Sequence, residues 1–290
     1  MGPRRALVAV LLGSGVAAAG YRRRALTADG AIAAAVVGAS TFGFGGAPAA
    51  AALIAFFVSG SALSRRRPVA DEVRAAKGHR RDALQVAANG GVAALAAVLG
   101  AAGLASAPGA TLGALAAASA DTWASELGVY SPTMPRSIVT GRTVPPGTSG
   151  GVTALGWLAA AGGAGAVGLA HALAMRERRV IRHTFGVALA SGLLGSLTDS
   201  LAGATLQAGY RCPSCGHVSE APGEHCGTSL TLVRGVGWAT NDSVNIICTV
   251  AGGLAGALLW RRVPRASPAG ASGRRGGQIP ANRRSGRESA

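Results

Sequence analysis

The chain is short of charge, of aromatic rings and of acids. Only 14% of its 290 residues are charged, whereas soluble domains carry about a quarter. With a mean hydropathy of +0.35, this shortage excludes an ordinary soluble domain. Apolar runs long enough to cross about 30 Å of hydrocarbon as helices recur along the chain. We therefore expect an all-α, polytopic transmembrane helical bundle with about 8 spans and a small cysteine-rich loop.

The scarcity of aromatic residues, 4% of the chain, argues against a second class of protein. No basic face interleaved with aromatic rings is present for base stacking, so we expect no nucleic-acid partner. The net charge of +16 lies in short loops and a tail, where it suits anionic lipid headgroups. The 45 glycines instead indicate close contacts between helices through small residues.

Glycine, proline and arginine divide the apolar runs. Residues 1–26 form an N-terminal span or a cleaved signal-like segment, residues 27–262 a membrane-embedded domain, and residues 263–290 a basic tail that we expect to be disordered. The expected spans are Ala6–Gly20, Gly30–Gly45, Ala47–Leu63, Asp82–Ala105, Pro108–Leu127, Gly151–Met175, Ile181–Ala208 and Thr240–Trp260.

This topology places four loops on one side of the membrane. Their excess of Lys and Arg predicts that this side is cytoplasmic, although the arginines between Met175 and His183 oppose it. We expect an integral protein of a prokaryotic plasma membrane, with its site on the cytoplasmic face. The four loops are Tyr21–Asp29, Arg65–Asp82, Val129–Gly150 and Gly209–Ala239.

Four of the 12 acidic residues lie at span ends on this side: Asp121, Glu126, Asp199 and Asp242. An acid in hydrocarbon costs at least a few kcal/mol, so such residues usually mark a functional site. Facing carboxylates repel unless a cation lies among them, which predicts Mg²⁺ at Asp121, Asp199 and Asp242. The alternative is that each acid caps a helix or pairs with a loop arginine.

The spacing of the acids limits which of them share a site. Asp121 and Glu126 are five residues apart, or about 140° around a helix. We expect both in one narrow site only if the helix ends between them. Helical spacing also predicts a polar pocket from amides on the faces of the spans, namely Gln85, Asn89, Gln207, Asn241 and Asn245.

Phosphate-binding residues are expected beside these acids. A glycine-rich segment precedes the sixth span, and its backbone N–H groups, followed by a helix start, favour anions. It is not a Walker motif, and a flexible loop or simple anchoring by arginines remains an alternative. The predicted phosphate and nucleotide residues are Arg80, Arg81, Arg136, Arg142, Gly147, Thr148, Gly150 and Gly151.

Three of the four cysteines cluster in the loop before the last span. Cys212 and Cys215 form a C-x-x-C knuckle, and Cys226 follows downstream. This pattern predicts a structural Zn²⁺ site, with His225 or His217 as the fourth ligand. Free thiols and a disulfide remain alternatives.

Five motifs in order resemble the integral membrane family of domain of unknown function ninety-two, which includes plant phytyl-phosphate kinase. The resemblance covers roughly Thr27 to Trp260, and leaves out the N-terminal span and the basic tail. Ser119-Ala120 departs from the glycine expected before the first acid. The motifs are Asp121–Gly128, Gly147–Thr153, Asp199–Gln207, His225–Gly227 and Asn241–Asn245.

The resemblance implies a polytopic α-helical enzyme, similar in outline to CTP-using lipid kinases and phosphatidate cytidylyltransferases. Its plant member converts a prenyl monophosphate into the diphosphate. With the acids and arginines above, this predicts a kinase that uses CTP or ATP and Mg²⁺ on an isoprenoid lipid. An ion-coupled small-solute transporter and a non-catalytic membrane scaffold are the rival predictions.

Overall fold

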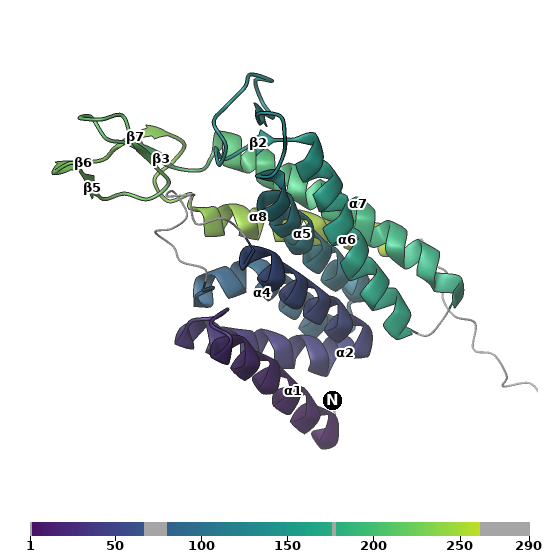
Figure 1. The fold of residues 1–290 in the computed structure, drawn as a ribbon. Helices are drawn as coiled ribbons and strands as arrows, with labels where there is room; N and C mark the ends of the chain where they lie inside the picture. Colours follow the sequence, from purple (N-terminus) through teal and green to yellow (C-terminus); the bar gives the residue numbers. More distant parts are fainter. Residues whose placement is uncertain (1, 67–79, 176–177, 262–290) are drawn as a thin grey trace, which may run out of the picture.

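A bundle of long helices with short strands at one end makes up the computed structural model, which describes residues 2–66, 80–175 and 178–261 (Figure 1). The tail expected to be disordered, and most of the loop 65–82, lie outside the described residues. The helices are α1 (Pro3–Arg22), α2 (Ala28–Ser64), α4 (Ala83–Ala101), α5 (Ala107–Gly128), α6 (Ala154–Met175), α7 (Arg178–Thr205) and α8 (Asn241–Trp260).

The helical bundle is confirmed, whereas the number of spans remains a prediction. Within the described ranges, 5 helices are long and apolar enough to cross a membrane, namely α2, α4, α6, α7 and α8. Polar residues explain why the other two fall short. Arginines lie in the first and last turns of α1, and the last turns of α5 carry Asp121 and Glu126.

The hairpin expected within residues 30–63 is present as a sharp kink inside α2. Gly46 has φ +73° and ψ −167°, a conformation open to glycine. A Cβ added at Gly30 would lie 2.2 Å from the carbonyl oxygen of Arg81, and one at Gly60 would lie 2.9 Å from its guanidinium. Thirty residues of straight helix would separate those two glycines by about 45 Å. The second half of α2 therefore runs back along the first.

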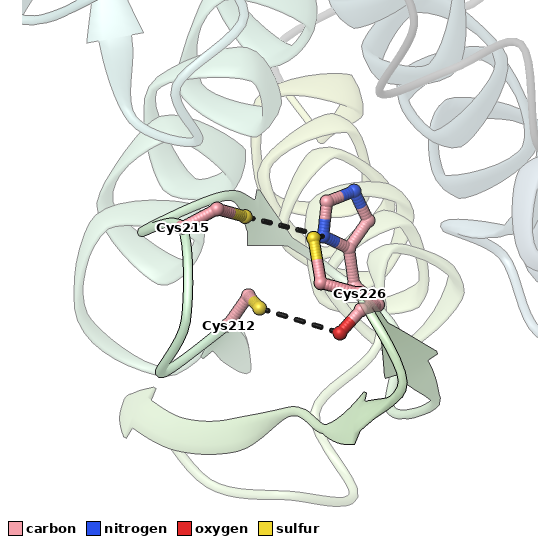
Figure 2. Close-up of side chains that lie close together, drawn as sticks. Cys212, Cys215 and Cys226 are labelled. Atoms are coloured by element: carbon pink, nitrogen blue, oxygen red, sulfur yellow. Dashed lines mark hydrogen bonds between the residues drawn. The ribbon is translucent and has the colours of Figure 1, made fainter.

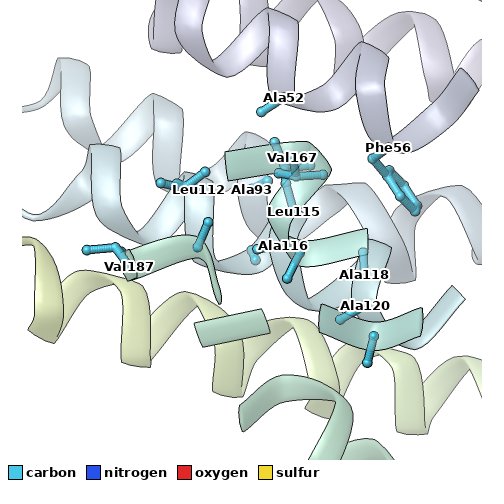
Figure 3. Close-up of a cluster of buried hydrophobic side chains, with 14 residues drawn as sticks. Ala52, Phe56, Ala93, Leu112, Leu115, Ala116, Ala118, Ala120, Val167 and Val187 are labelled. Atoms are coloured by element: carbon cyan, nitrogen blue, oxygen red, sulfur yellow. The ribbon is translucent and has the colours of Figure 1, made fainter. Parts of the chain in front are cut away.

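Helix α5 is the centre of the bundle and contacts α4, α6, α7 and α8. Its buried stretch runs from Ala107 to Ala120, and Leu112 and Leu115 on it are fully buried in a core made mostly of alanine (Figure 3). Against α8 the contact is backbone on backbone. A Cβ at Gly113 would lie 2.2 Å from the carbonyl oxygen of Gly252. Small residues thus replace the missing aromatic rings as the means of packing.

Short antiparallel strands, which the sequence analysis treated as plain loops, order the segments at one end of the bundle (Figure 1). They form because turns with glycine in left-handed conformations bring short stretches of chain together. The strands are β1 (Arg136–Ser137) with β2 (Gly151–Val152); β4 (Val218–Ser219), β3 (Gly209–Arg211) and β7 (Thr231–Arg234) in one sheet; and β5 (Glu224–His225) with β6 (Thr228–Ser229).

Candidate functional site

A polar cavity of about 610 Å³ lies at this end of the bundle. The last turns of α5 and α7 and the first turns of α4 and α8 converge on it, and loop residues 146–153 and 219–221 complete its wall. The predicted site residues that line it are Arg80, Arg81, Gln85, Asn89, Asp121, Glu126, Gly147, Thr148, Gly150, Gly151, Asp199, Gln207, Asn241 and Asn245.

Three of the four predicted acids line this cavity: Asp121 and Glu126 from α5, and Asp199 from α7. Helix α5 continues to Gly128, so it does not end between its two acids, and the site that both line is wider than the narrow one considered above. Both carboxylates reach the site because the cavity extends around the end of the helix. Ser64 Oγ donates a hydrogen bond of 2.9 Å to Glu126 Oε1. The acidic wall thus joins three helices.

Asp242 is the acid that does not line the cavity. It is 7% exposed in the first turn of α8, whereas its neighbours Asn241 and Asn245 are in the cavity wall. Asp242 and Asn241 point about 100° apart around the helix, which accounts for the difference. Two of the three predicted Mg²⁺ ligands, Asp121 and Asp199, thus line the cavity, and the full set of three stays a prediction.

The remaining pair of carboxylates still fits a magnesium ion. Mg²⁺ is usually bound by one or two carboxylates, with water and substrate phosphates as the other ligands. Asp121 and Asp199 line the same cavity. In the described part of the chain, a group of three or more close metal ligands is found in the cysteine loop and not among these acids.

The two arginines before α4 lie in the cavity wall and are held by neighbouring groups. Arg80 donates from Nε and Nη2 to the carbonyl oxygen of Leu26, at 3.1 and 2.9 Å. The guanidinium carbon of Arg81 lies 5.6 Å from the ring centre of Phe56. Burial lowers the pKa of Arg81, and the charge of Glu126 opposes that shift. Arg81 is thus a partly desolvated cation facing an acidic wall.

Arg136 and Arg142, the other two predicted arginines, are exposed and do not line the cavity. They lie on either side of a tight turn, in which Ser137 N donates to the carbonyl oxygen of Arg142 at 2.9 Å. Arg136 Nη1 donates to the carbonyl oxygen of Gly141 at 3.0 Å. The turn directs both side chains away from the site.

The glycine-rich segment reaches the cavity by lying directly on α7. Gly147 and Gly150 have φ of +82° and +77°, which favours glycine at both positions. A Cβ at Gly150 would lie 2.4 Å from Cβ of Ala204 and 2.7 Å from the carbonyl oxygen of Ser200. The loop is therefore packed in place, and the alternative of a freely flexible loop does not describe it.

The amides of the predicted polar pocket have local as well as cavity contacts. Asp82 caps α4 by accepting from Gln85 N at 2.9 Å, and Gln85 Oε1 accepts from Asp82 N at 3.3 Å. Asp-x-x-Gln is a capping-box pattern that the sequence analysis missed. Gln207 differs: it is 3% exposed in the cavity wall, and within the described segments its Nε2 has no hydrogen-bond partner. A buried donor of this kind indicates room for a ligand acceptor.

Several cavity residues were not predicted from the sequence. Ser196 and Ser200 are on the same face of α7 as Asp199 and Gly203, so helical spacing could have found them. Glu220 of the cysteine loop also lines the cavity, where it accepts a hydrogen bond from Ser149 Oγ. No local sequence pattern predicts the contact between Ser149 and Glu220, because 71 residues separate them.

A second, apolar pocket of about 60 Å³ adjoins the polar cavity. It lies between α1, both halves of α2, and α4, and its wall includes Val37, Phe42, Leu53, Ile54, Phe56 and Phe57. Arg81, Gln85 and Asn89 line both cavities. A charged compartment and an apolar one therefore meet at these three side chains.

The cysteine loop gathers the metal-ligand candidates on one side of β5 and β6. The ligand atoms of Cys212, Cys215, His225 and Cys226 all lie within 4.8 Å of one another (Figure 2). The hydrogen bond with Thr228 is the largest of the contacts that lower the pKa of Cys212 to about 5. Three sulfurs and one imidazole of the loop thus lie close together, an arrangement that could hold a metal ion.

A bundle with several apolar helices and a charged cavity at one end is the architecture of a polytopic integral membrane protein. The family model described as "Integral membrane protein DUF92" matches residues 11–253, and the chain belongs to this family. The match starts at residue 11, inside α1, so the family region includes the second half of this helix. The resemblance described above began only near Thr27.

Two relatives cover most of the chain. "Protein PGR" of Arabidopsis thaliana is 31% identical over 275 residues, which covers 84% of this chain and 92% of the plant protein. "Uncharacterized membrane protein MJ0933" of Methanocaldococcus jannaschii is 29% identical over 239 residues, with 82% and 87% covered. No solved structure matches the chain.

Proposed function

We propose that this chain is a membrane-embedded, nucleotide-dependent kinase of a prenyl phosphate or a related isoprenoid lipid. The observation that carries the proposal is the junction at Arg81, Gln85 and Asn89, where the apolar pocket opens beside the polar cavity. An isoprenoid phosphate has the same division, with an apolar tail and an anionic head. The family resemblance to a prenyl-phosphate kinase leads independently to the same substrate class.

The cavity residues suit a transfer between two phosphates. The γ-phosphoryl group of the nucleotide would pass to a phosphate oxygen of the lipid, which leaves the nucleoside diphosphate and a prenyl diphosphate. Such a transfer needs charge neutralisation and alignment more than covalent chemistry. Arg80 and Arg81 provide positive charge, and the backbone of Gly147–Gly151 provides N–H groups for phosphate oxygens.

A magnesium ion would supply the remaining charge neutralisation when it is bound. Asp121 and Asp199 are the residues that would hold it, with Glu126 as a further ligand or a base beside it. The Ser64 hydroxyl orients Glu126 through the hydrogen bond described above. The buried amide of Gln207 would donate to a phosphate or ribose oxygen.

The test is a transfer assay on the purified chain in detergent with Mg²⁺. Labelled CTP or ATP is supplied with a panel of prenyl alcohols and prenyl monophosphates, and the labelled lipid product is separated. We expect incorporation into a prenyl monophosphate, and none without Mg²⁺. Uptake of a solute by reconstituted vesicles without nucleotide consumption would instead support the transporter.

The Asp199→Asn variant tests the metal role. We expect it to lower turnover by at least about 100-fold, because the ion that would neutralise the transferring phosphoryl group loses one of its carboxylate ligands. Its membrane insertion and elution profile should be unchanged. Asp29→Asn is the matched control, since Asp29 is exposed in the first turn of α2 and an amide oxygen can still accept from Ala83 N. Unchanged turnover in Asp199→Asn would refute the metal role.

We place the site on the cytoplasmic face of a prokaryotic plasma membrane, on the basis of the Lys and Arg content of the loops. Val139 is 54% exposed at the cavity end of the bundle. A Val139→Cys variant should react with a membrane-impermeant maleimide in inside-out vesicles and not in right-side-out vesicles, relative to the parent chain. The reverse pattern would put the cavity on the outer face.

A further inference from the structure

We propose that the loop between α7 and α8 binds one Zn²⁺, and that this ion holds the loop in place as a wall of the polar cavity. The four ligands are Sγ of Cys212, Cys215 and Cys226 and Nδ1 of His225.

The spacing of the ligand atoms suits a tetrahedral ion. Nδ1 of His225 lies 3.2 Å from Sγ of Cys215 and 3.2 Å from Sγ of Cys226 (Figure 2). Zn–S bonds of about 2.3 Å and Zn–N bonds of about 2.0 Å set sulfur and nitrogen about 3.5 Å apart at tetrahedral angles. Three thiolates and one imidazole also match the closed ligand sets of structural zinc sites.

The backbone explains how two adjacent residues can face one ion. Cys226 and Gly227 have φ of +54° and +70°, and they connect β5 to β6 as a two-residue hairpin turn. Turns of this type need positive φ at both central positions and favour Asn-Gly or Gly-Gly. A cysteine at the first position is costly for the backbone, so its thiol must contribute something that an asparagine would not. Metal ligation is such a contribution.

The first knuckle is built in the same way. Gly216, with φ +76°, turns the chain so that its N–H donates to the carbonyl oxygen of Cys212 at 2.9 Å. This turn brings Cys212 and Cys215 to the same side. His217 stacks on the ring of His225, with centroids 4.3 Å apart, and is not in the ligand group. The choice between the two histidines, open from the sequence, therefore falls on His225.

The loop that carries the proposed zinc site is also bonded to the wall of the polar cavity. Glu220 lies between Cys215 and His225 in the sequence and accepts a hydrogen bond from Ser149 of the glycine-rich loop. Arg234 Nη1 donates to the carbonyl oxygen of Ser149 at 3.4 Å. Most side chains of the loop are exposed, apolar ones such as Leu232 and Trp238 included, and few of its apolar side chains are buried. A small segment without its own core typically needs a metal or a disulfide.

Metal analysis of the full chain tests the site without relying on turnover. The protein is purified in detergent from cells supplied with zinc, and its metal content is measured by mass spectrometry. We expect one zinc per chain, lost in Cys215→Ser and in His225→Ala. Cys248→Ser and His217→Ala are the controls and should keep the ion, because Cys248 is buried in α8 and His217 is outside the ligand group.

Other results would overturn the proposal. Zinc-free parent protein refutes the site, whether its thiols are free or its mass is two hydrogens lower through a disulfide. Loss of zinc in His217→Ala but not in His225→Ala refutes the ligand assignment.

Replacement by Co²⁺ should give the visible absorption of thiolate ligands at a tetrahedral ion.

The role as a cavity wall is tested by removing the ion. A zinc chelator should make residues 209–239 at least about tenfold more sensitive to protease, while the helical circular dichroism is retained. Unchanged protease resistance would refute the wall role even if zinc is present. Both readouts are independent of kinase activity, so failure of the kinase proposal would leave them unaffected.

Discussion

The helical body and the cysteine loop both line the polar cavity, but they are held in shape by different means. In the body, α5 is buried from Ala107 to Ala120, and its backbone meets that of α8 through glycines. In the loop, exposed strands surround a cluster of thiols. Close packing of small residues suits a protein in lipid. Burying an apolar side chain between helices there gains little free energy, because lipid tails are as apolar as the side chain, so the helices associate through van der Waals contact. The loop lies outside the apolar spans and depends on a few polar contacts and on the Zn²⁺ ion that we propose.

The largest expected effect comes from adding a methyl group where α5 meets α8. In Gly113→Ala the new Cβ would lie 2.2 Å from the carbonyl oxygen of Gly252 and 2.9 Å from Cα of Gly256. Two backbones would have to separate, so we expect a loss of about 3 kcal/mol or more of stability. Thermal unfolding in detergent, followed by size-exclusion chromatography, measures the loss.

Gly91→Ala in α4 is the control for that variant, because nothing lies within 4 Å of the Cβ it would add. An alanine there should be neutral or stabilising by up to about 1 kcal/mol. Equal melting temperatures for the two variants would contradict backbone packing of α5 on α8.

A smaller effect is expected where the glycine-rich loop lies on α7. Gly150→Ala places a methyl group 2.4 Å from Cβ of Ala204. This clash should lower the stability of the loop packing by about 1–3 kcal/mol, in addition to the strain from the positive φ. Gly141→Ala has the same kind of strain, with φ +67°, but nothing within 4 Å. The difference between the two variants in nucleotide affinity isolates the contact. Equal affinities would show that this loop does not shape the site.

The smallest effect is expected from single hydroxyl groups on α2. Ser64→Ala removes the hydrogen bond to Glu126, worth about 0.5–1.5 kcal/mol, and should weaken Mg²⁺-dependent nucleotide binding several-fold. Ser61→Ala is the control, since within the described chain Ser61 Oγ has no hydrogen-bond partner. Titration calorimetry compares the two. A larger effect from Ser61→Ala would contradict the orienting role of Ser64.

The sequence predicted those features of the fold that depend on local patterns. The apolar runs located the helices, the glycines near residue 46 located the kink in α2, and the ends of the apolar runs located Asp121, Glu126 and Asp199 at the cavity. Each depends only on residues a few positions apart. The alternation of spans and loops predicted four acids and four arginines on one side of the membrane, and three of these acids and two of these arginines line the cavity.

Orientation and long-range contacts could not be predicted in the same way. Arg136 and Arg142 turn away because of a tight turn whose geometry depends on φ at Gly141. Asp242 is outside the cavity wall although its neighbours line it, which depends on the rotation of α8 against α5 and α7. Glu220 reaches the cavity through packing between distant loops. Such features are set by tertiary packing, for which a single sequence carries no local pattern.

The glycine contacts between α5 and α8 also set which parts of the molecule can move. A Cβ at Gly256 would lie 2.1 Å from the carbonyl oxygen of Gly109. The backbones of the two helices are therefore in direct contact at their glycines. If α5 moved along α8 by a fraction of a helical turn, their backbone atoms would clash. The part of the cavity wall that α5 and α8 form therefore keeps its shape. We therefore expect any opening of the cavity at the loop residues 219–221 of its wall rather than between α5 and α8.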